Sequence, residues 1–400
     1  MQMPLPAASR IPIQKAPTTQ IKTQSTAGKK ASWTQRSTTY MFILAALFTL
    51  TAGMSTIISL TNSFDIGEQE HTSQTNSMAS PTPGPVLFGT PYPEPVAAIA
   101  VQNANRVRPL ADLAKKEIRE VAYSPDGKWL AVTDSTGISL MDNQTLEQIH
   151  FIKTDITSWV SSMAFAPDSQ LLASGSADGT MRLWLTDATH ITTLKGHSAR
   201  VTSVAFSMDS RMVASASWDR TVRLWESDGT LVSTLSEHTS RVKRATFSPD
   251  GKILASASDD RTVRLWDISG THLTTLEGHT AYVNDVAFSP DGRTLATASH
   301  DKTVHLWSVD GTLIDTLEGH TEKVNRVVFS PDGEMLASAS ADLTIRLWAT
   351  DGTPLYTLSG QSTWPGSISM TFSPDGKTLA SASGERVRLW GVPREGKKSG

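Results

Sequence analysis

The chain has 400 residues, no cysteine and a formal net charge of −3. The length allows two or three ordinary domains or one large repeat architecture. The absence of cysteine excludes disulfides, thiolate metal sites and cysteine nucleophiles, and the charge balance gives no bulk electrostatic reason to expect a nucleic-acid partner. Residues 1–40 nevertheless carry six basic and no acidic residues. We expect this segment to be a disordered cytoplasmic tail, and binding to anionic lipid is a further possibility for it.

Residues 41–60, MFILAALFTLTAGMSTIISL, contain no charged side chain. A helix of 20 residues spans about 30 Å, which is the thickness of the hydrocarbon core of a bilayer. Lys29, Lys30 and Arg36 precede the segment and acidic residues follow it, and basic flanks stay in the cytoplasm. The sequence therefore predicts a single-pass signal anchor with the rest of the chain outside the cytoplasm. A cleaved signal peptide and a buried soluble helix remain alternatives.

Residues 61–104 are rich in Ser, Thr and Pro, and six prolines fall within residues 80–95. Proline fixes φ and removes a backbone donor, so this composition predicts an extended linker. A proline motif that binds a partner's groove is the alternative. Residues 394–400 are expected to form a short tail.

Residues 105–393 contain a repeat. Ser-Pro-Asp-Gly or a close variant occurs seven times, beginning at Ser124, Ala166, Ser207, Ser248, Ser289, Ser330 and Ser373. A tryptophan closes six of the units, at Trp184, Trp225, Trp266, Trp307, Trp348 and Trp390, and Met141 takes this place in the first. Each unit contains four short segments with alternating apolar residues, separated by turn residues. Small sheets of this kind bury both faces by packing around an axis, so the repeat predicts an all-β, seven-bladed propeller.

The units resemble WD repeats, whose signature is Gly-His followed by Trp-Asp. Gly-His occurs at His197, His279 and His320, Glu replaces Gly before His238, and Trp266-Asp267 matches the second dipeptide. With the predicted anchor, the chain resembles a bacterial-type membrane-anchored WD-repeat protein. The resemblance implies a ring closed by overlap, with Asn105 to Leu110 as the outer strand of the last blade. It also implies a non-catalytic platform for protein–protein interaction.

Four equally spaced histidines invite a catalytic or metal-binding interpretation, but residues repeated in every blade cannot converge on one site. The resemblance instead implies buried hydrogen-bond sets that stabilise single blades. By position these sets are His197, Ser215, Asp219 and Trp225; His238, Ser256, Asp260 and Trp266; His279, Thr297, Asp301 and Trp307; and His320, Ser338, Asp342 and Trp348.

Positions on the loop face near the central opening differ between units, as a specific binding surface would. The predicted partner-binding residues are Trp159, Arg200, Trp218, Arg241, Lys243, Asp259, Tyr282, Asn284, His300, Lys323 and Trp364, with Glu117, Arg119, Asp134, Ser161, Thr202 and Asn325 at further positions of this kind. Drift of exposed positions would also produce such variation. Enzyme motifs are missing, and we expect no catalytic residue, metal or cofactor. A protein or peptide is the expected partner, with a cell-surface hydrolase or lyase and a carbohydrate receptor as alternatives.

Overall fold

A computed structural model describes residues 91–115, 117–154, 159–360 and 369–393, all within a unit that spans residues 78–400. The predicted cytoplasmic tail, the anchor at 41–60, most of the linker and the tail at 394–400 lie outside the described residues. Within the described part of the chain, no helix is both long enough and apolar enough to cross a membrane.

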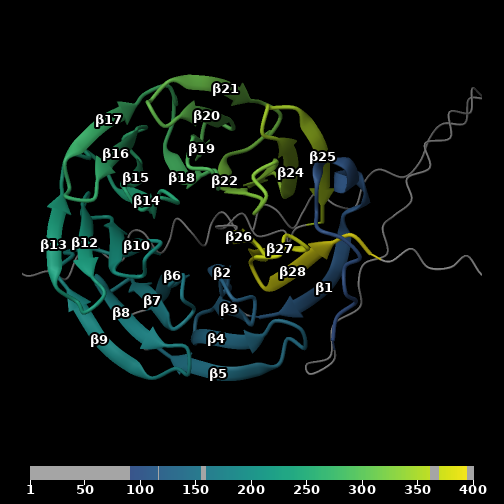
Figure 1. Ribbon diagram of the computed structural model, residues 1–400, viewed down its shortest axis with the longest axis horizontal. Helices are drawn as coiled ribbons and strands as arrows, with labels where there is room; N and C mark the ends of the chain where they lie inside the picture. The colour runs from purple at the N-terminus through teal and green to yellow at the C-terminus, as the bar shows by residue number, and fades with distance from the viewer. Residues whose placement is uncertain (1–90, 116, 155–158, 361–368, 394–400) are drawn as a thin grey trace, which may run out of the picture. The chain divides into compact units, whose positions relative to one another are not determined.

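Seven four-stranded antiparallel sheets form the blades of a propeller, as the repeat predicts (Figure 1). Blades 1 to 3 consist of β2 (Glu120–Tyr123), β3 (Trp129–Thr133), β4 (Gly137–Asp142) and β5 (Gln148–Lys153); β6 (Val160–Phe165), β7 (Leu171–Ser176), β8 (Thr180–Leu185) and β9 (His190–Lys195); and β10 (Val201–Phe206), β11 (Met212–Ser217), β12 (Val222–Glu226) and β13 (Leu231–Leu235). Blades 4 and 5 consist of β14 (Val242–Phe247), β15 (Ile253–Ser258), β16 (Val263–Asp267) and β17 (His272–Leu276); and β18 (Val283–Phe288), β19 (Thr294–Ser299), β20 (Val304–Ser308) and β21 (Leu313–Leu317). Blade 6 consists of β22 (Val324–Phe329), β23 (Met335–Ser340), β24 (Thr344–Ala349) and β25 (Pro354–Ser359), and blade 7 of β26 (Ser369–Phe372), β27 (Thr378–Ser383), β28 (Arg386–Gly391) and β1 (Arg108–Ala114).

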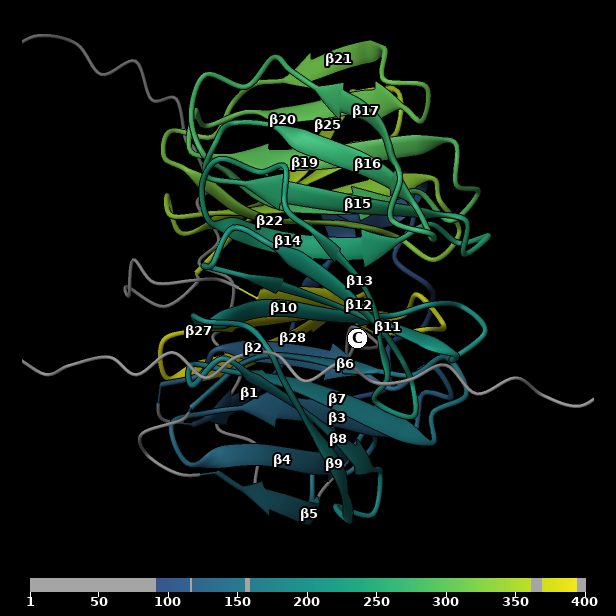
Figure 2. The same cartoon turned by 90° about the vertical axis from the view of Figure 1, so that its left-hand side faces the viewer.

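The first strand of each blade lies nearest the axis, and the outer strands lie at the rim of the ring (Figure 1). The inner strands run roughly along the axis, and the outer strands are tilted against them (Figure 2). The apolar core lies between neighbouring blades. Ala214, Ala216 and Leu224 of blade 3, for example, form one buried cluster with Leu254 and Trp266 of blade 4. Small residues in the second strand let the large tryptophan of the next blade pack closely against it, and burial of this apolar surface drives the sheets together.

The Ser-Pro-Asp-Gly segments form the turns that join the first and second strands. In blade 4, Ser248 Oγ donates to Asp250 Oδ1 at 2.6 Å and accepts from the backbone N–H of Ile253 at 3.0 Å. Gly251 has φ = +70°, a conformation that favours glycine. The degenerate copies place Ser169 and Ser210 in the same conformation, at φ values of 58° and 60°.

Blade 7 closes the ring, because β1 pairs with β28 in the antiparallel direction and Ala111 lies opposite Leu389. The predicted overlap is therefore present, but the predicted strand at 105–110 is wrong by several residues. Residues Val101–Arg106 form a 3₁₀ helix, η1, and the strand starts only at Arg108. Ile99, within the predicted linker, is buried between blades 6 and 7, and its backbone N–H donates to Gly376 O at 2.9 Å.

Candidate functional site

Each of blades 3 to 6 contains a buried polar set, which we call the blade frame. In blade 4, His238 Nδ1 lies 2.7 Å from Asp260 Oδ2, and His238 Nε2 lies 2.8 Å from Ser256 Oγ. Trp266 Nε1 donates to the same hydroxyl at 2.8 Å. The sets of His197, His279 and His320 have the same contacts at 2.7–2.9 Å. The histidines thus contact residues of their own blades and do not converge.

The aspartates of the frames are held in their ionised form. Burial alone would raise the pKa of Asp260, but hydrogen bonds from His238, Thr262 and the backbone of Thr239 outweigh it and hold the pKa well below its usual range. The directions are the same for Asp219, Asp301 and Asp342. A carboxylate held in this way is a poor general acid or base, which agrees with a structural role.

An arginine of the third strand lies beside the Gly-His dipeptide. A Cβ at Gly319 would come within 2.6 Å of Arg346 Nη1, so glycine leaves the space that the guanidinium fills. In blade 4, where Glu237 replaces glycine, the glutamate carboxylate accepts from Arg264 Nη1 at 2.8 Å instead. Blade 5 has His305 at this position, and its ring stacks on that of His279 with 3.8 Å between centroids.

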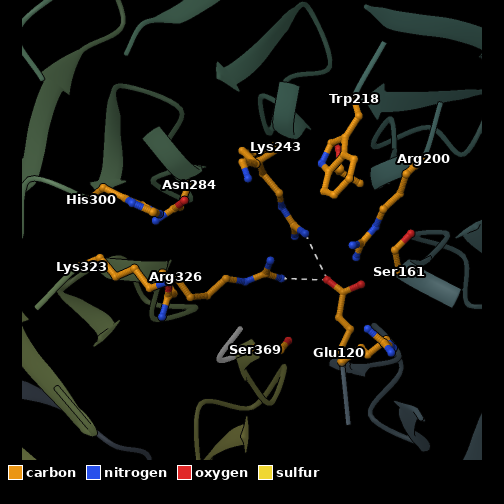
Figure 3. A pocket seen from close by; sticks show the side chains of 14 residues that line it. Glu120, Ser161, Arg200, Trp218, Lys243, Asn284, His300, Lys323, Arg326 and Ser369 are labelled. Carbon is orange, nitrogen blue, oxygen red and sulfur yellow. Dashed lines mark hydrogen bonds and ion pairs between the residues drawn. The ribbon is translucent and has the colours of Figure 1, made fainter. Parts of the chain in front are cut away.

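The axial mouth is a cavity of about 330 Å³ at the end of the channel where the first strands begin. Its lining residues are Arg119, Glu120, Ser161, Arg200, Thr202, Trp218, Lys243, Arg244, Asn284, His300, Lys323, Asn325, Arg326 and Ser369. Figure 3 shows labelled side chains from blades on different sides of the ring pointing toward the middle of this cavity. Six of the lining residues are Lys or Arg and one is acidic.

An alternating arc of arginine and tryptophan side chains follows one side of the mouth, and we call it the arginine–tryptophan arc. The Arg119 guanidinium lies 4.5 Å from the ring centroid of Trp159, and that of Arg200 lies 5.9 Å from Trp159 and 5.2 Å from Trp218. Arg241 completes the arc at 4.3 Å from Trp218. The arc joins residues next to the first strands of blades 1 to 4 with Trp218 in the turn after β11, and the tryptophan rings hold the guanidinium groups in place.

The floor of the mouth is an ion network that crosses the channel, which we call the axial ion network. Glu120 Oε1 lies 3.1 Å from Arg244 Nη1 and 3.1 Å from Arg326 Nη2. Asp285 lies 3.4 Å from Arg244 Nε and 3.6 Å from Arg326 Nε. Figure 3 shows Glu120 reaching toward Arg326 across the centre of the cavity. The network separates the polar mouth from an apolar cavity at the other opening, which Phe247, Phe288 and Phe329 line.

Glu120, Arg244, Asp285 and Arg326 occupy equivalent positions in the first strands of their blades. Residues at this position also bond to the backbone of the next blade. Ser162 Oγ accepts from the backbone N–H of Val204 in the next blade at 3.2 Å, and Asp285 Oδ2 accepts from Val327 N–H at 2.9 Å. The arginines of blades 4 and 6 reach across the axis instead. Sequence reasoning missed this network. The signal that could have found it is the alternation of Glu120, Arg244, Asp285 and Arg326 at a position that is Ser in the other three blades.

The structure brings most of the predicted partner-binding residues together. Arg200, Trp218, Lys243, Asn284, His300 and Lys323 line the mouth. The remaining predicted residues contact that lining or each other: Trp159 and Arg241 in the arc, Asp259 with Lys243 at 3.4 Å, and Tyr282 with His300 at 5.4 Å between ring centroids. Trp364 lies outside the described residues.

Several predicted surface residues have internal contacts, and Ser161 and Thr202 each donate to a carbonyl of the next blade. Asn284 Nδ2 donates to Val324 O at 2.8 Å and so joins blade 5 to blade 6, although the residue also lines the mouth. Asp134 is buried, and its carboxylate accepts from Thr136 and from Gly137 N–H within its own turn. The shorter turn of the first unit makes Asp134 a turn cap, and its place on the binding face stays a prediction.

The mouth is electropositive. Burial is the main cause that lowers the pKa of His300, and the nearby charges of Lys323 and Lys243 lower it further. Burial and the neighbouring Arg119 also lower the pKa of Arg200. Among the described residues, no carboxylate lies within 4.0 Å of a charged nitrogen of Arg200, Arg241 or Lys323. The arrangement is suited to binding an anionic group.

Comparison with protein families identifies six repeats. The model of the WD domain, G-beta repeat (WD40), matches residues 146–184, 188–226, 229–267, 270–308, 311–349 and 352–391, which together make up more than half of the chain. The first blade, which lacks the His, Asp and Trp of the signature, is largely outside these matches. A search of curated proteins finds no match. The six matched repeats and the seven-bladed ring show that this chain belongs to the WD40 repeat family.

Proposed function

We propose that the chain is a membrane-tethered, non-catalytic binding platform that recruits a protein or peptide partner at the axial mouth, outside the cytoplasm. Membership in the WD40 family supports a binding role. The tether rests on the uncharged segment 41–60 and its basic N-terminal flank. One observation carries the proposal: residues that differ between blades converge on one cavity, whereas the repeated residues stay within their blades.

The arc favours a protein partner over a carbohydrate. Sugar-binding sites use the open face of an aromatic ring, but Trp218 lies between Arg200 and Arg241, and Trp159 lies between Arg119 and Arg200. Trp218 and Tyr282 are 36% and 50% exposed. Exposed aromatic and arginine side chains around a cavity are typical of the energetic centres of protein interfaces.

The axial ion network argues against a hydrolase or lyase. The carboxylates nearest the axis are Glu120 and Asp285, and arginine guanidinium groups contact both of them. A hydrolase or lyase that used a carboxylate here would need one that is free to exchange a proton with substrate. Paired with arginines, these two groups are better suited to closing the channel.

Photo-crosslinking in intact cells tests the proposed binding face. A photoreactive phenylalanine analogue at Tyr282 should capture one defined partner. The same analogue at Ile314, which is 57% exposed on outer strand β21, should not. Equal capture at the two positions, or capture only at Ile314, would remove the axial mouth as the binding face.

The absence of cysteine makes the membrane topology directly testable. A single cysteine in place of Arg211, which is 85% exposed at the side chain, should react with a membrane-impermeant maleimide in intact cells. A cysteine in place of Ser25 should react only after the membrane is opened. The reverse pattern, or labelling of both positions in intact cells, would contradict the proposed orientation.

A further inference from the structure

We infer that the partner segment entering the axial mouth is acidic, and that its Asp and Glu carboxylates bind to Arg119, Arg200 and Lys323. The inference rests on the proposed function and names the chemistry of the partner at that site. It is carried by the imbalance of charge inside the cavity and by the way the arginines are held.

The positive charges of the lining outnumber the carboxylates that could neutralise them. Glu120 is the only acidic residue of the lining, and both Arg244 and Arg326 already bind it. Asp259 compensates Lys243 at 3.4 Å, and Glu117 approaches Arg119 only to 4.0 Å with a side chain that is 69% exposed. Arg200 and Lys323 therefore present charges that no described carboxylate within 4.0 Å offsets. Burial first, and then the neighbouring charge of Arg119, lower the pKa of Arg200, and a bound anion would offset the repulsion between the two guanidinium groups.

The arginines are pre-organised for carboxylates. Stacking against Trp159 and Trp218 restricts Arg119 and Arg200 before any ligand arrives, so binding loses less side-chain entropy. A planar guanidinium matches a carboxylate with two parallel hydrogen bonds, and in a recessed cavity such charge-assisted bonds are stronger than at an open surface. Lys323 and Asn325 add donors to the lining of the same cavity.

The geometry favours a peptide over a nucleic acid. Single-stranded nucleic acid needs open aromatic faces on which bases stack, whereas guanidinium groups lie against the rings of the arc. The axial ion network crosses the floor of the mouth and stands in the way of a strand that would follow the channel. Side chains on a peptide can enter this cavity from the mouth, and a cavity of about 330 Å³ is large enough for side chains but too small for a folded domain.

Fluorescence anisotropy with the full chain in detergent tests the inference. The probes are a labelled peptide with six consecutive Asp and Glu residues, its Asn and Gln counterpart, a phosphoserine counterpart and a single-stranded oligonucleotide of equal charge. We expect the acidic peptide to bind one-to-one and at least about tenfold more tightly than the neutral peptide, with an affinity that falls as salt rises. Binding should also raise the pKa of His300, measured from its ring-proton shifts.

Matched variants locate the binding. Lys323→Glu should weaken the acidic peptide by at least about tenfold, and Arg200→Gln gives a second test that does not reverse a charge beside the tryptophans. Lys252→Glu makes the same charge change as the first variant but in a Ser-Pro-Asp-Gly turn at the other end of its blade, with a side chain that is 79% exposed. It should leave affinity within about twofold.

Three results would overturn the inference: equal binding of the acidic and neutral peptides, equal weakening by Lys252→Glu and Lys323→Glu, or tighter binding of the phosphopeptide or oligonucleotide than of the acidic peptide. If crosslinking at Tyr282 captures a partner that Lys323→Glu does not release, the binding platform stands and only its acidic specificity fails. If the acidic peptide binds but Tyr282 captures nothing in cells, the cavity chemistry stands and the proposed function fails.

Discussion

The central blades and the closing blade use the same strand position in different ways. In blades 4 and 6, the arginine of the third strand binds close to its own blade, to Glu237 at 2.8 Å or to Gly319 O at 2.7 Å. In blade 7, Arg388 binds Asp112 of β1 through both ends of the carboxylate, at 2.6 and 2.7 Å. A residue that stabilises one blade elsewhere thus joins the two ends of the ring here. The difference shows that a buried ion pair adds to the backbone pairing of β1 with β28 at the closure, while the central blades contain local frames.

Asp112→Ala should have the largest effect, because it leaves the buried guanidinium of Arg388 without its partner. Removing one member of a buried ion pair costs about 3–5 kcal/mol of unfolding free energy. Urea unfolding measures this loss. Arg386→Ala is the matched control, since Arg386 contacts the same carboxylate at 3.3 Å with a side chain that is half exposed; it should cost at most about 1 kcal/mol. Equal losses would show that the closure does not depend on the buried pair.

His238→Ala should break a central blade with a somewhat smaller effect. The change removes the two hydrogen bonds that join the His238 ring to the Ser256 hydroxyl and the Asp260 carboxylate and takes away a buried ring, which together cost about 2–4 kcal/mol. His272→Ala in the same blade removes a partly exposed ring and should cost about 1 kcal/mol or less. Thermal unfolding of both variants checks the prediction. Equal melting temperatures would show that the frame does not stabilise the blade.

His305→Arg should make blade 5 resemble blade 6 and remove one source of acid sensitivity. Burial, and then the neighbouring His279, lower the pKa of His305 to about 4. The unfolded chain therefore takes up this proton first as pH falls from about 6.5 to about 4, which destabilises the fold by up to about 1.4 kcal/mol per pH unit. We expect the melting temperature of the wild type to fall more than that of the variant between pH 7 and 5. Parallel losses would contradict the assignment.

Ser210→Gly should give the smallest effect and the opposite sign. Ser210 has φ = 60° where complete copies of the turn have glycine, and the left-handed conformation costs a non-glycine residue about 1 kcal/mol. Gly251→Ser in blade 4 is the reciprocal change, at a position where a Cβ has open space, so only backbone strain acts. The first should raise and the second should lower the unfolding free energy. Changes of the same sign would show that the strain lies elsewhere.

The fold was predictable from the sequence because the repeat has a regular period. Six tryptophans at intervals of 41 or 42 residues place each blade, and equal spacing also predicts the members of each His frame. The overlapping closure of the ring was predictable from the register of the repeats. The bounds of the strand that closes it were not. Nothing in Val101–Arg106 signals a 3₁₀ helix, and that helix moves the start of β1 to Arg108.

Contacts between distant blades were not predictable from the period. Glu120 and Arg326 are 206 residues apart, and a repeat says which residues are equivalent but not which of them meet across the axis. Asn284 shows the same limit: the sequence indicates a variable surface position, and only the structure shows its bond to the carbonyl of Val324. The arc was visible as scattered Arg and Trp residues, yet their alternation depends on the packing of neighbouring blades.

Partner capture and thermal unfolding, measured together on two variants, test most directly whether binding and folding are divided between different residues. The double change Trp218→Ala with Tyr282→Ala should abolish capture by a general chemical crosslinker added to intact cells and lower the melting temperature by only about 3 °C, because both side chains are substantially exposed. His238→Ala should instead lower the melting temperature strongly and retain capture below that temperature. Retained capture by the double variant, or loss of stability as large as that of His238→Ala, would contradict the division.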